Sequence, residues 1–140
     1  MSSQVYNNFK SGVMSSSVNL SGDDIYVVLV TSTYTINIDT HTTYSDITNQ
    51  VSGTGYTTSG QALTSKEFST DLTNDKGIFD AADSTWSSST ITARAAIIYK
   101  KGNTPALSPL ICYVDFGSDK SSSSANFTIQ WNSSGIINIT

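Results

Sequence analysis

The strongest hydrophobic pattern in the chain is an unbroken apolar run over residues 25–30, which a polar Ser-Gly-Asp-Asp turn precedes. A short continuous run of β-branched and aliphatic residues is typical of a strand that is buried on both faces. Residues 33–38 instead alternate between polar and apolar side chains, which predicts a half-buried strand. Residues 90–99 alternate and then become continuously apolar, and residues 107–116 contain a second apolar run. Both of these segments are therefore predicted strands.

Further short strands are predicted at residues 62–72, 77–81, around Trp86, 125–131 and 136–139. Clusters of Gly, Asn, Asp and Ser predict loops and turns at residues 53–60, 74–77, 117–124 and 132–135, and a single helical turn is predicted within residues 44–51. About eight short strands with turn signals roughly every ten residues predict an all-β fold, either a β-sandwich or a jelly roll. Because no internal repeat or separable linker is visible, residues 1–140 are predicted to form one β-sandwich domain.

One short helix is predicted at the start of the chain. Tyr6, Phe9 and Val13 fall at spacings of three and four within residues 4–14, which is the periodicity of one face of an amphipathic helix. Within residues 1–20 this helix has two possible roles. It would either close one end of the core or form an arm that docks on a neighbouring chain.

Serine and threonine dominate the composition, with 25 Ser and 19 Thr among 140 residues, whereas only 13% of the residues are charged. Serine and threonine compete for backbone hydrogen bonds and so disfavour long helices. The formal net charge of −4, without a cluster of Lys or Arg, argues against a nucleic-acid partner. No run approaches the roughly 18 apolar residues of a membrane span. Residues 1–20 also lack the basic and apolar regions of a cleaved leader, so neither membrane association nor export is expected.

Residues that could carry chemistry are scarce. The chain has one His (His41) and one Cys (Cys112). A Ser-His-Asp arrangement through His41 would lack the Gly-x-Ser-x-Gly elbow, so we interpret His41 as a solvated loop residue. Cys112 lies in an apolar run and is predicted to be a small core residue. A single Cys excludes an internal disulfide framework and a Cys-rich zinc site.

Three pairs of aspartates are the candidates for a metal site or a glycosidase pair: Asp23/Asp24, Asp80/Asp83 and Asp115/Asp119. None follows the calcium-loop pattern, and all lie at predicted turns, where Asp is favoured for backbone reasons. Asp80 and Asp83 together with a loop carbonyl would make the best of these metal sites. We nevertheless expect no catalytic residue, no metal site and no cofactor, and hence no enzyme.

Aromatic and apolar residues near loops and chain ends are the candidates for an interaction surface. Surface tyrosines in a Ser/Thr/Asn background suit an adhesive surface, and an uncharged terminal strand suits strand addition to a neighbour. Packing within the core or an ordinary in-domain strand is the competing interpretation for each candidate. The candidates are Tyr6, Phe9, Val13, Tyr34, Tyr44, Tyr56, Ile136, Ile137 and Ile139.

Several stretches of the chain resemble a family of small proteins encoded by tailed bacteriophages. They are NLSGDDIYVVL (19–29), YSDITNQVSGTGYT (44–57), TWSSSTITAR (85–94), and then SPLI (108–111), YVDFGSD (113–119) and NFTIQW (126–131). The resemblance implies a virion structural protein that decorates or cements the capsid on the phage particle. It also implies the major capsid protein as the partner and a homo-oligomer, either a dimer or a trimer. It supplies no motif residue that marks a site.

Two alternatives remain open. The chain could be an adhesive or receptor-binding module of a tail or head fibre, with exposed tyrosines and hydroxyl-rich loops that contact host glycan. A glycan-processing enzyme that uses the aspartate pairs is the weaker alternative.

Overall fold

The computed structural model describes all 140 residues, and its central element is a five-stranded antiparallel sheet. The strand order is β1-β8-β7-β2-β3, so β1 and β3 are the edge strands. These strands are β1 (Ser2–Val5), β8 (Leu110–Ser121), β7 (Thr92–Lys100), β2 (Ile25–Val30) and β3 (Gln61–Ala62).

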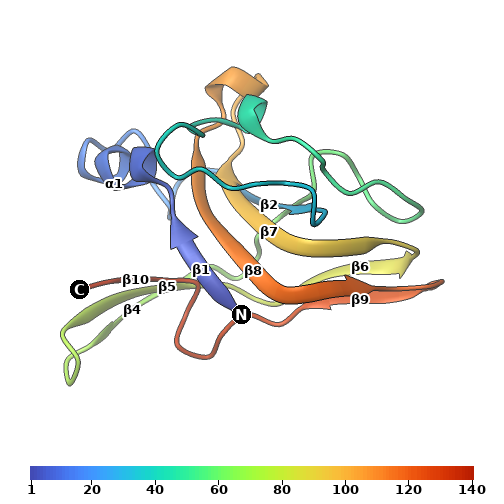
Figure 1. Cartoon of the computed structure of the whole chain (residues 1–140). Helices are drawn as coiled ribbons and strands as arrows, with labels where there is room; N and C mark the ends of the chain where they lie inside the picture. Colours follow the sequence, from blue (N-terminus) through green and yellow to red (C-terminus); the bar gives the residue numbers. More distant parts are fainter.

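Two smaller antiparallel sheets lie below the five-stranded sheet in Figure 1 and form the second layer. One has the order β10-β5-β4 and the other pairs β6 with β9. Their strands are β4 (Glu67–Asp71), β5 (Lys76–Asp80), β6 (Ser84–Ser89), β9 (Ala125–Ile129) and β10 (Ile137–Ile139). The prediction of an all-β fold with a short N-terminal helix is confirmed, and the two layers form a sandwich.

The predicted helix begins later than its periodicity indicated. α1 spans Asn7–Met14, whereas the two residues before Tyr6 belong to β1. Two single turns of 3-10 helix follow, η1 (Tyr44–Asp46) and η2 (Pro105–Leu107). η1 lies within the predicted helical turn and begins with a capping box, in which the side chains of Thr43 and Asp46 each accept from the other's backbone N–H.

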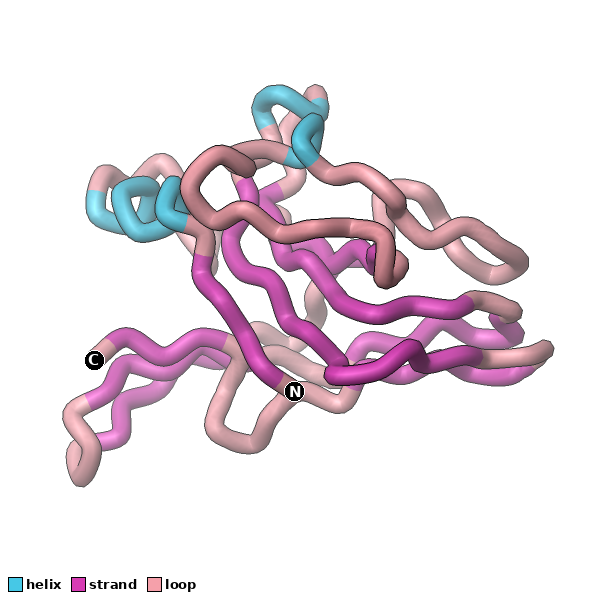
Figure 2. Tube along the Cα trace, viewed as in Figure 1, coloured by secondary structure: helices cyan, strands magenta, loops and turns pink.

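The five-stranded sheet is buried on both faces. Along β2, Val27 and Leu29 face the main core between the two layers, whereas Val28 and Val30 face a second core, as the two-residue period of a strand requires. The main core also contains Phe79 and other side chains of the lower layer. The second core is closed by the long segment between β2 and β3, which runs over the sheet in Figure 2.

The predicted strand at residues 33–38 is wrong, because this segment is a loop without a ladder partner. Tyr34 is 5% exposed in the second core, and Ile36 and Ile38 pack against that core. The alternation of apolar and polar residues therefore comes from a loop in which every second side chain packs against one face of the sheet. A period of two shows which side chains are buried, but it does not show that the backbone pairs.

Two further boundaries differ from the prediction. The expected strand at residues 62–72 is divided into β3 and β4 by the segment 63–66. The expected loop at 117–124 is occupied by β8 as far as Ser121. β8 contains a bulge of four residues there. Ala95 pairs with Asp115 and Ala93 pairs with Lys120, which leaves one residue of β7 opposite residues 116–119.

A glycine in the loop before β3 tests how closely the backbone packs on β2. Gly60 has φ +74°, and a Cβ there would overlap the carbonyl of Val27. Gly117 in the bulge of β8 has a similar φ of +82° but has no atom within 4 Å of such a Cβ. We expect Gly117→Ala to lower the free energy of unfolding by about 1 kcal/mol, the cost of a left-handed alanine. Gly60→Ala should cost at least about 2 kcal/mol more, because the backbone of β2 must also move.

Urea unfolding of the two variants and the wild type measures this difference. Equal losses in the two variants would contradict the close approach of the Gly60 loop to β2.

Candidate functional site

The best candidate for a functional site is a groove on the open side of the sandwich, between β1 of the upper layer and the C-terminal segment of the lower layer. We call it the edge groove. Its volume is about 320 Å³, within the range of small binding sites. Its lining includes Met1, Ser3, Val5, Val114, Trp131, Asn132, Ser134, Ile136, Ile137 and Asn138.

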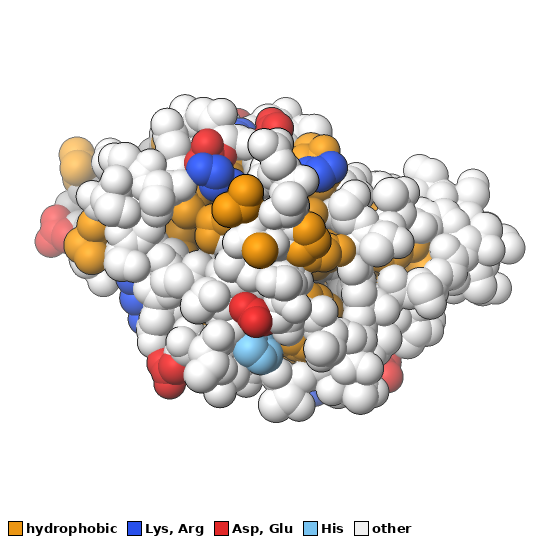
Figure 3. All heavy atoms as spheres, turned by 90° about the horizontal axis from the view of Figure 1, so that it is seen from above, with side chains coloured by type: hydrophobic (Ala, Val, Ile, Leu, Met, Phe, Trp, Pro, Cys, Tyr) orange, Lys and Arg blue, Asp and Glu red, His pale blue; other side chains and the backbone are white.

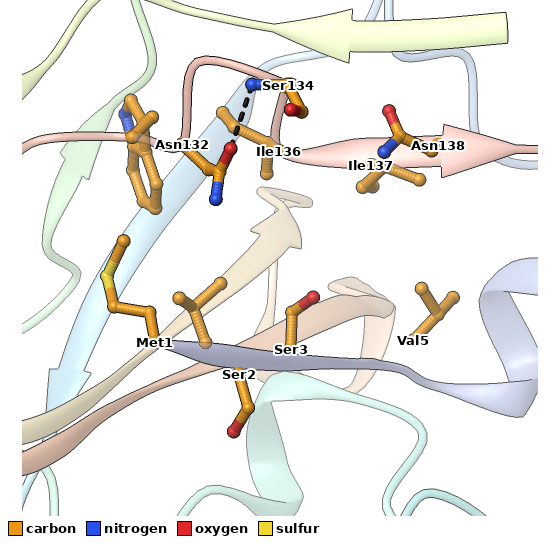
Figure 4. Close-up of a pocket in the computed structure, with 12 residues that line it drawn as sticks. Met1, Ser2, Ser3, Val5, Asn132, Ser134, Ile136, Ile137 and Asn138 are labelled. Carbon is orange, nitrogen blue, oxygen red and sulfur yellow. Dashed lines mark hydrogen bonds between the residues drawn. The ribbon is translucent and has the colours of Figure 1, made fainter. Parts of the chain in front are cut away.

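Figure 4 shows how the two sides of the edge groove face each other. The side chains of Met1, Ser3 and Val5 project from β1 toward the C-terminal segment, whereas Ser2 projects to the opposite side of the strand. On the C-terminal side, the backbone N–H of Ser134 donates to the Oδ1 atom of Asn132 at 2.8 Å and so fixes the turn before β10. The groove therefore has one wall in each layer of the sandwich.

Both walls end in an edge strand with a free side. β1 pairs only with β8, and β10 pairs only with β5. The N–H of Tyr6 donates to the carbonyl of Ile111 at 3.0 Å, which makes Tyr6 a hydrogen-bonded position relative to β8. Because such positions alternate along an antiparallel strand, the backbone N–H and C=O groups of Ser3 and Val5 point away from β8. They are available to an added strand.

The edge groove carries no charged side chain, and neither do β1 or β10. The opposite edge of the three-stranded sheet, β4, has Glu67 at one end and Asp71 at the other. Charged residues on an edge strand discourage pairing with another chain. β4 therefore has a protection that β1 and β10 lack.

Three of the predicted interface residues are corrected by their burial. Tyr6 is 0% exposed, Phe9 2% and Tyr34 5%. The hydroxyl of Tyr34 lies 3.0 Å from that of Tyr6 and 2.8 Å from Nδ1 of His41, so His41 is a half-buried loop residue with a hydrogen bond to this cluster. Burial raises the pKa of both tyrosines. These side chains belong to the two cores and hold the N-terminal segment and the 31–60 loop on the sheet.

The other predicted interface residues keep some access to the surface or to the groove. Ile136 and Ile137 are buried in the main core, at 8% and 5% exposed, and reach the surface only where they line the edge groove, whereas Ile139 of β10 is 55% exposed. Val13 is half-buried against the main core.

Tyr44 and Tyr56 are half-buried and joined through Gln50. The Tyr44 hydroxyl donates to Oε1 of Gln50 at 2.7 Å, and Nε2 of Gln50 donates to the Tyr56 hydroxyl at 2.8 Å. The Tyr56 hydroxyl accepts from the backbone N–H of Leu29 at 2.9 Å. Burial raises the pKa of Tyr56 to about 12. Both hydroxyl groups therefore act as neutral structural bridges at physiological pH.

Four of the six aspartates considered for a metal site have structural partners for their carboxylates. Asp23 forms an ion pair with Lys100 at 3.0 Å, and Asp83 accepts from the backbone N–H of Trp131 at 3.1 Å. Asp115 accepts from the N–H of Gly117 at 2.7 Å and from Nε of Arg94 at 3.0 Å. These two donors lower the pKa of Asp115. Asp80 accepts from the backbone N–H of the next residue, and no group of three or more His, Cys, Asp or Glu side chains converges anywhere in the chain.

Comparison of the chain with protein-family models, with curated proteins and with solved structures found no match. None of the helices has the length and apolar character that crossing a membrane requires.

The single thiol of the chain provides a test of the main core. Cys112 is 1% exposed, and burial raises the pKa of its thiol to about 12. Since the thiolate is the reactive form, iodoacetamide at pH 8 should modify the folded protein at least about 100-fold more slowly than the protein unfolded in guanidinium. Mass spectrometry of the alkylated chain measures both rates. Equal rates in the two states would show that β8 does not keep Cys112 enclosed.

Proposed function

We propose that this chain is a non-enzymatic structural protein of a tailed-bacteriophage particle, where it decorates or cements the capsid by binding the major capsid protein. The sequence stretches that resemble small phage virion proteins support the class of protein. The observation that carries the mode of action is the edge groove, where two edge strands without charged side chains, from different layers, flank one hollow that is lined in part by apolar side chains.

Strand addition is the mode of binding that this edge favours. An extended segment of the shell protein that pairs with β1 would use the free backbone groups of Ser3 and Val5 for affinity. Its side chains would meet Ile136 and Ile137 on the C-terminal wall of the groove, which gives the contact an apolar component. Contacts of this kind depend little on ion pairs, so salt should weaken them less than it weakens a charged interface.

Stabilisation of the shell then follows from mass action. A protein that binds only the assembled lattice lowers the free energy of the assembled state, and many symmetric copies add their contributions. We further propose that the subunit itself is a dimer or a trimer, because closed symmetric oligomers match the symmetry axes of a shell.

Two lysine substitutions at exposed apolar positions test the edge groove. Ile139 is 55% exposed on β10, next to the groove, and Leu107 is 63% exposed in η2, away from it. We expect Ile139→Lys to weaken rebinding to phage heads stripped of this protein by more than about tenfold, since a charge on β10 beside the groove opposes the burial of the apolar side chains of a segment added to β1. Leu107→Lys should rebind like the wild type. Sedimentation of heads with increasing concentrations of each variant gives the affinities, and thermal unfolding confirms that both variants are folded.

Copy number and particle stability test the proposed class of protein. Quantitative mass spectrometry of purified particles should give a copy number on the order of hundreds, close to that of the major capsid protein. Stripped heads should lose resistance to heat and osmotic shock and regain it when the protein is added back. Absence of the chain from particles would overturn the proposal. Particles that keep their resistance but fail to adsorb to the host would identify the fibre module instead.

A further inference from the structure

A second hollow lies on the face of the molecule that carries η1 and η2, away from the edge groove. It has a volume of about 370 Å³ and lies between the loop at residues 57–59 and the loop at 101–105. We call it the tyrosine pocket. Figure 3 looks onto this face and shows hydrophobic side chains gathered near its middle, bordered by uncharged atoms and by a few charged side chains.

Two aromatic rings form the inner wall of the tyrosine pocket. The ring centroids of Tyr44 and Tyr99 are 4.9 Å apart, with the rings tilted by 48°. The Tyr44 hydroxyl shares its one proton between Oε1 of Gln50 and the carbonyl of Thr58, which lies 2.8 Å away, and the Tyr99 hydroxyl donates to the carbonyl of Ser59 at 2.8 Å. Both hydroxyls are thereby committed to the 57–59 loop, so the rings are held in place and offer carbon surface to the pocket. Tyr44 is half-buried and supplies most of that surface, whereas Tyr99 is 2% exposed and lies behind it.

The rim of the tyrosine pocket is polar and nearly uncharged. It contains the side chains of Thr57, Thr58 and Ser59 on one side and of Asn103 and Thr104 on the other. The one charged side chain in the lining is Lys101, whose Nζ lies 4.6 Å from the ring centroid of Tyr26 and so already has an aromatic partner. Lys101 would be the one cation available to an anionic ligand, and it already contacts the ring of Tyr26. The lining is therefore a poor match for a phosphate or a carboxylate.

We infer that the tyrosine pocket binds a neutral carbohydrate. A pyranose ring has an apolar C–H face and a rim of hydroxyl groups. A fixed aromatic wall suits the C–H face, and a rim of hydroxyl and amide side chains suits the hydroxyl groups. The loops need no rearrangement to present these groups, because hydrogen bonds already tie the rings to them, and preorganisation favours binding of a small ligand. This inference is independent of the edge groove and holds for a capsid subunit and for a fibre module alike.

Saturation-transfer NMR and titration with a panel of neutral sugars test the inference. The panel contains glucose, galactose, mannose, N-acetylglucosamine and their oligosaccharides. We expect at least one member to bind the wild-type protein with a dissociation constant below about 10 mM. The affinity should remain within about twofold between low salt and about 0.5 M salt, since the ligand is neutral.

A matched pair of tryptophan substitutions locates the site. Thr104 lies on the rim, is exposed and makes no side-chain capping bond to η2, so Thr104→Trp fills the pocket without removing a structural contact. Thr73 is exposed in the turn between β4 and β5, so Thr73→Trp adds the same ring elsewhere. Thr104→Trp should weaken sugar binding more than about tenfold, and Thr73→Trp should leave it unchanged. Tyr44→Ala, which removes the aromatic wall, should have the same effect as Thr104→Trp.

Three results would overturn the inference. They are the absence of binding by every sugar in the panel, binding that survives Thr104→Trp, and an affinity that falls more than about tenfold in high salt. The last result would show that binding depends on the charge of Lys101 rather than on the aromatic wall. Because Thr104→Trp changes an exposed side chain, its outcome remains interpretable if Tyr44→Ala does not fold.

Discussion

The rest of the structure depends on the burial of the five-stranded sheet on both of its faces. A strand such as β2, whose successive side chains are apolar, is stable only when both faces of its sheet are covered. The lower layer covers one face, and the 31–60 segment covers the other with side chains such as Tyr34 and Tyr44. Most of the tyrosines of this chain are used for this second cover. The hydroxyl groups of Tyr34, Tyr44 and Tyr99 form hydrogen bonds with His41, Gln50 and the carbonyl of Ser59 and hold an irregular backbone in place.

The same constraint determines where the molecule is open. Covers that lie above and below a sheet leave its lateral edges exposed. At the β1 edge of the upper sheet the lower layer ends in an edge strand as well, so that β1 and β10 face each other across the edge groove. The 31–60 segment that covers the upper face of the sheet is a loop. Hollows can form between the turns of such a loop and the loops that lie next to it. The tyrosine pocket is a hollow of this kind, between the 57–59 and 101–105 loops.

The sequence allowed prediction of the fold class but of little of the site. Continuous apolar runs located β2, β7 and the first half of β8, because burial on both faces leaves a pattern that is independent of the partner. The same rule failed at residues 33–38, where a loop packs on a sheet with the periodicity of a strand. β1 was missed because Ser2, Ser3 and Gln4 have no apolar alternation, and its ladder with β8 joins residues more than a hundred positions apart.

The edge groove was also beyond local reasoning. The uncharged C-terminal strand was recognised as a candidate for strand addition, but nothing in the sequence showed that it faces β1. The spacing of Tyr6 and Phe9 fits either a helix that closes the core or an arm that docks on a neighbour. Their burial decides for the core, and it depends on packing against a sheet whose strands are distant in the sequence.

The bulge in β8 has a consequence for how the chain tolerates changes in length. Residues 116–119 lie opposite one residue of β7, and strand pairing resumes beyond them, where Lys120 pairs with Ala93. The backbone at Gly117 is exposed, and the space beside it is open. Extra residues inserted at this point would lengthen the bulge outward without shifting the ladder on either side. Natural length variation among homologous chains would accumulate here, and a foreign peptide epitope could be displayed here while the sandwich stays intact.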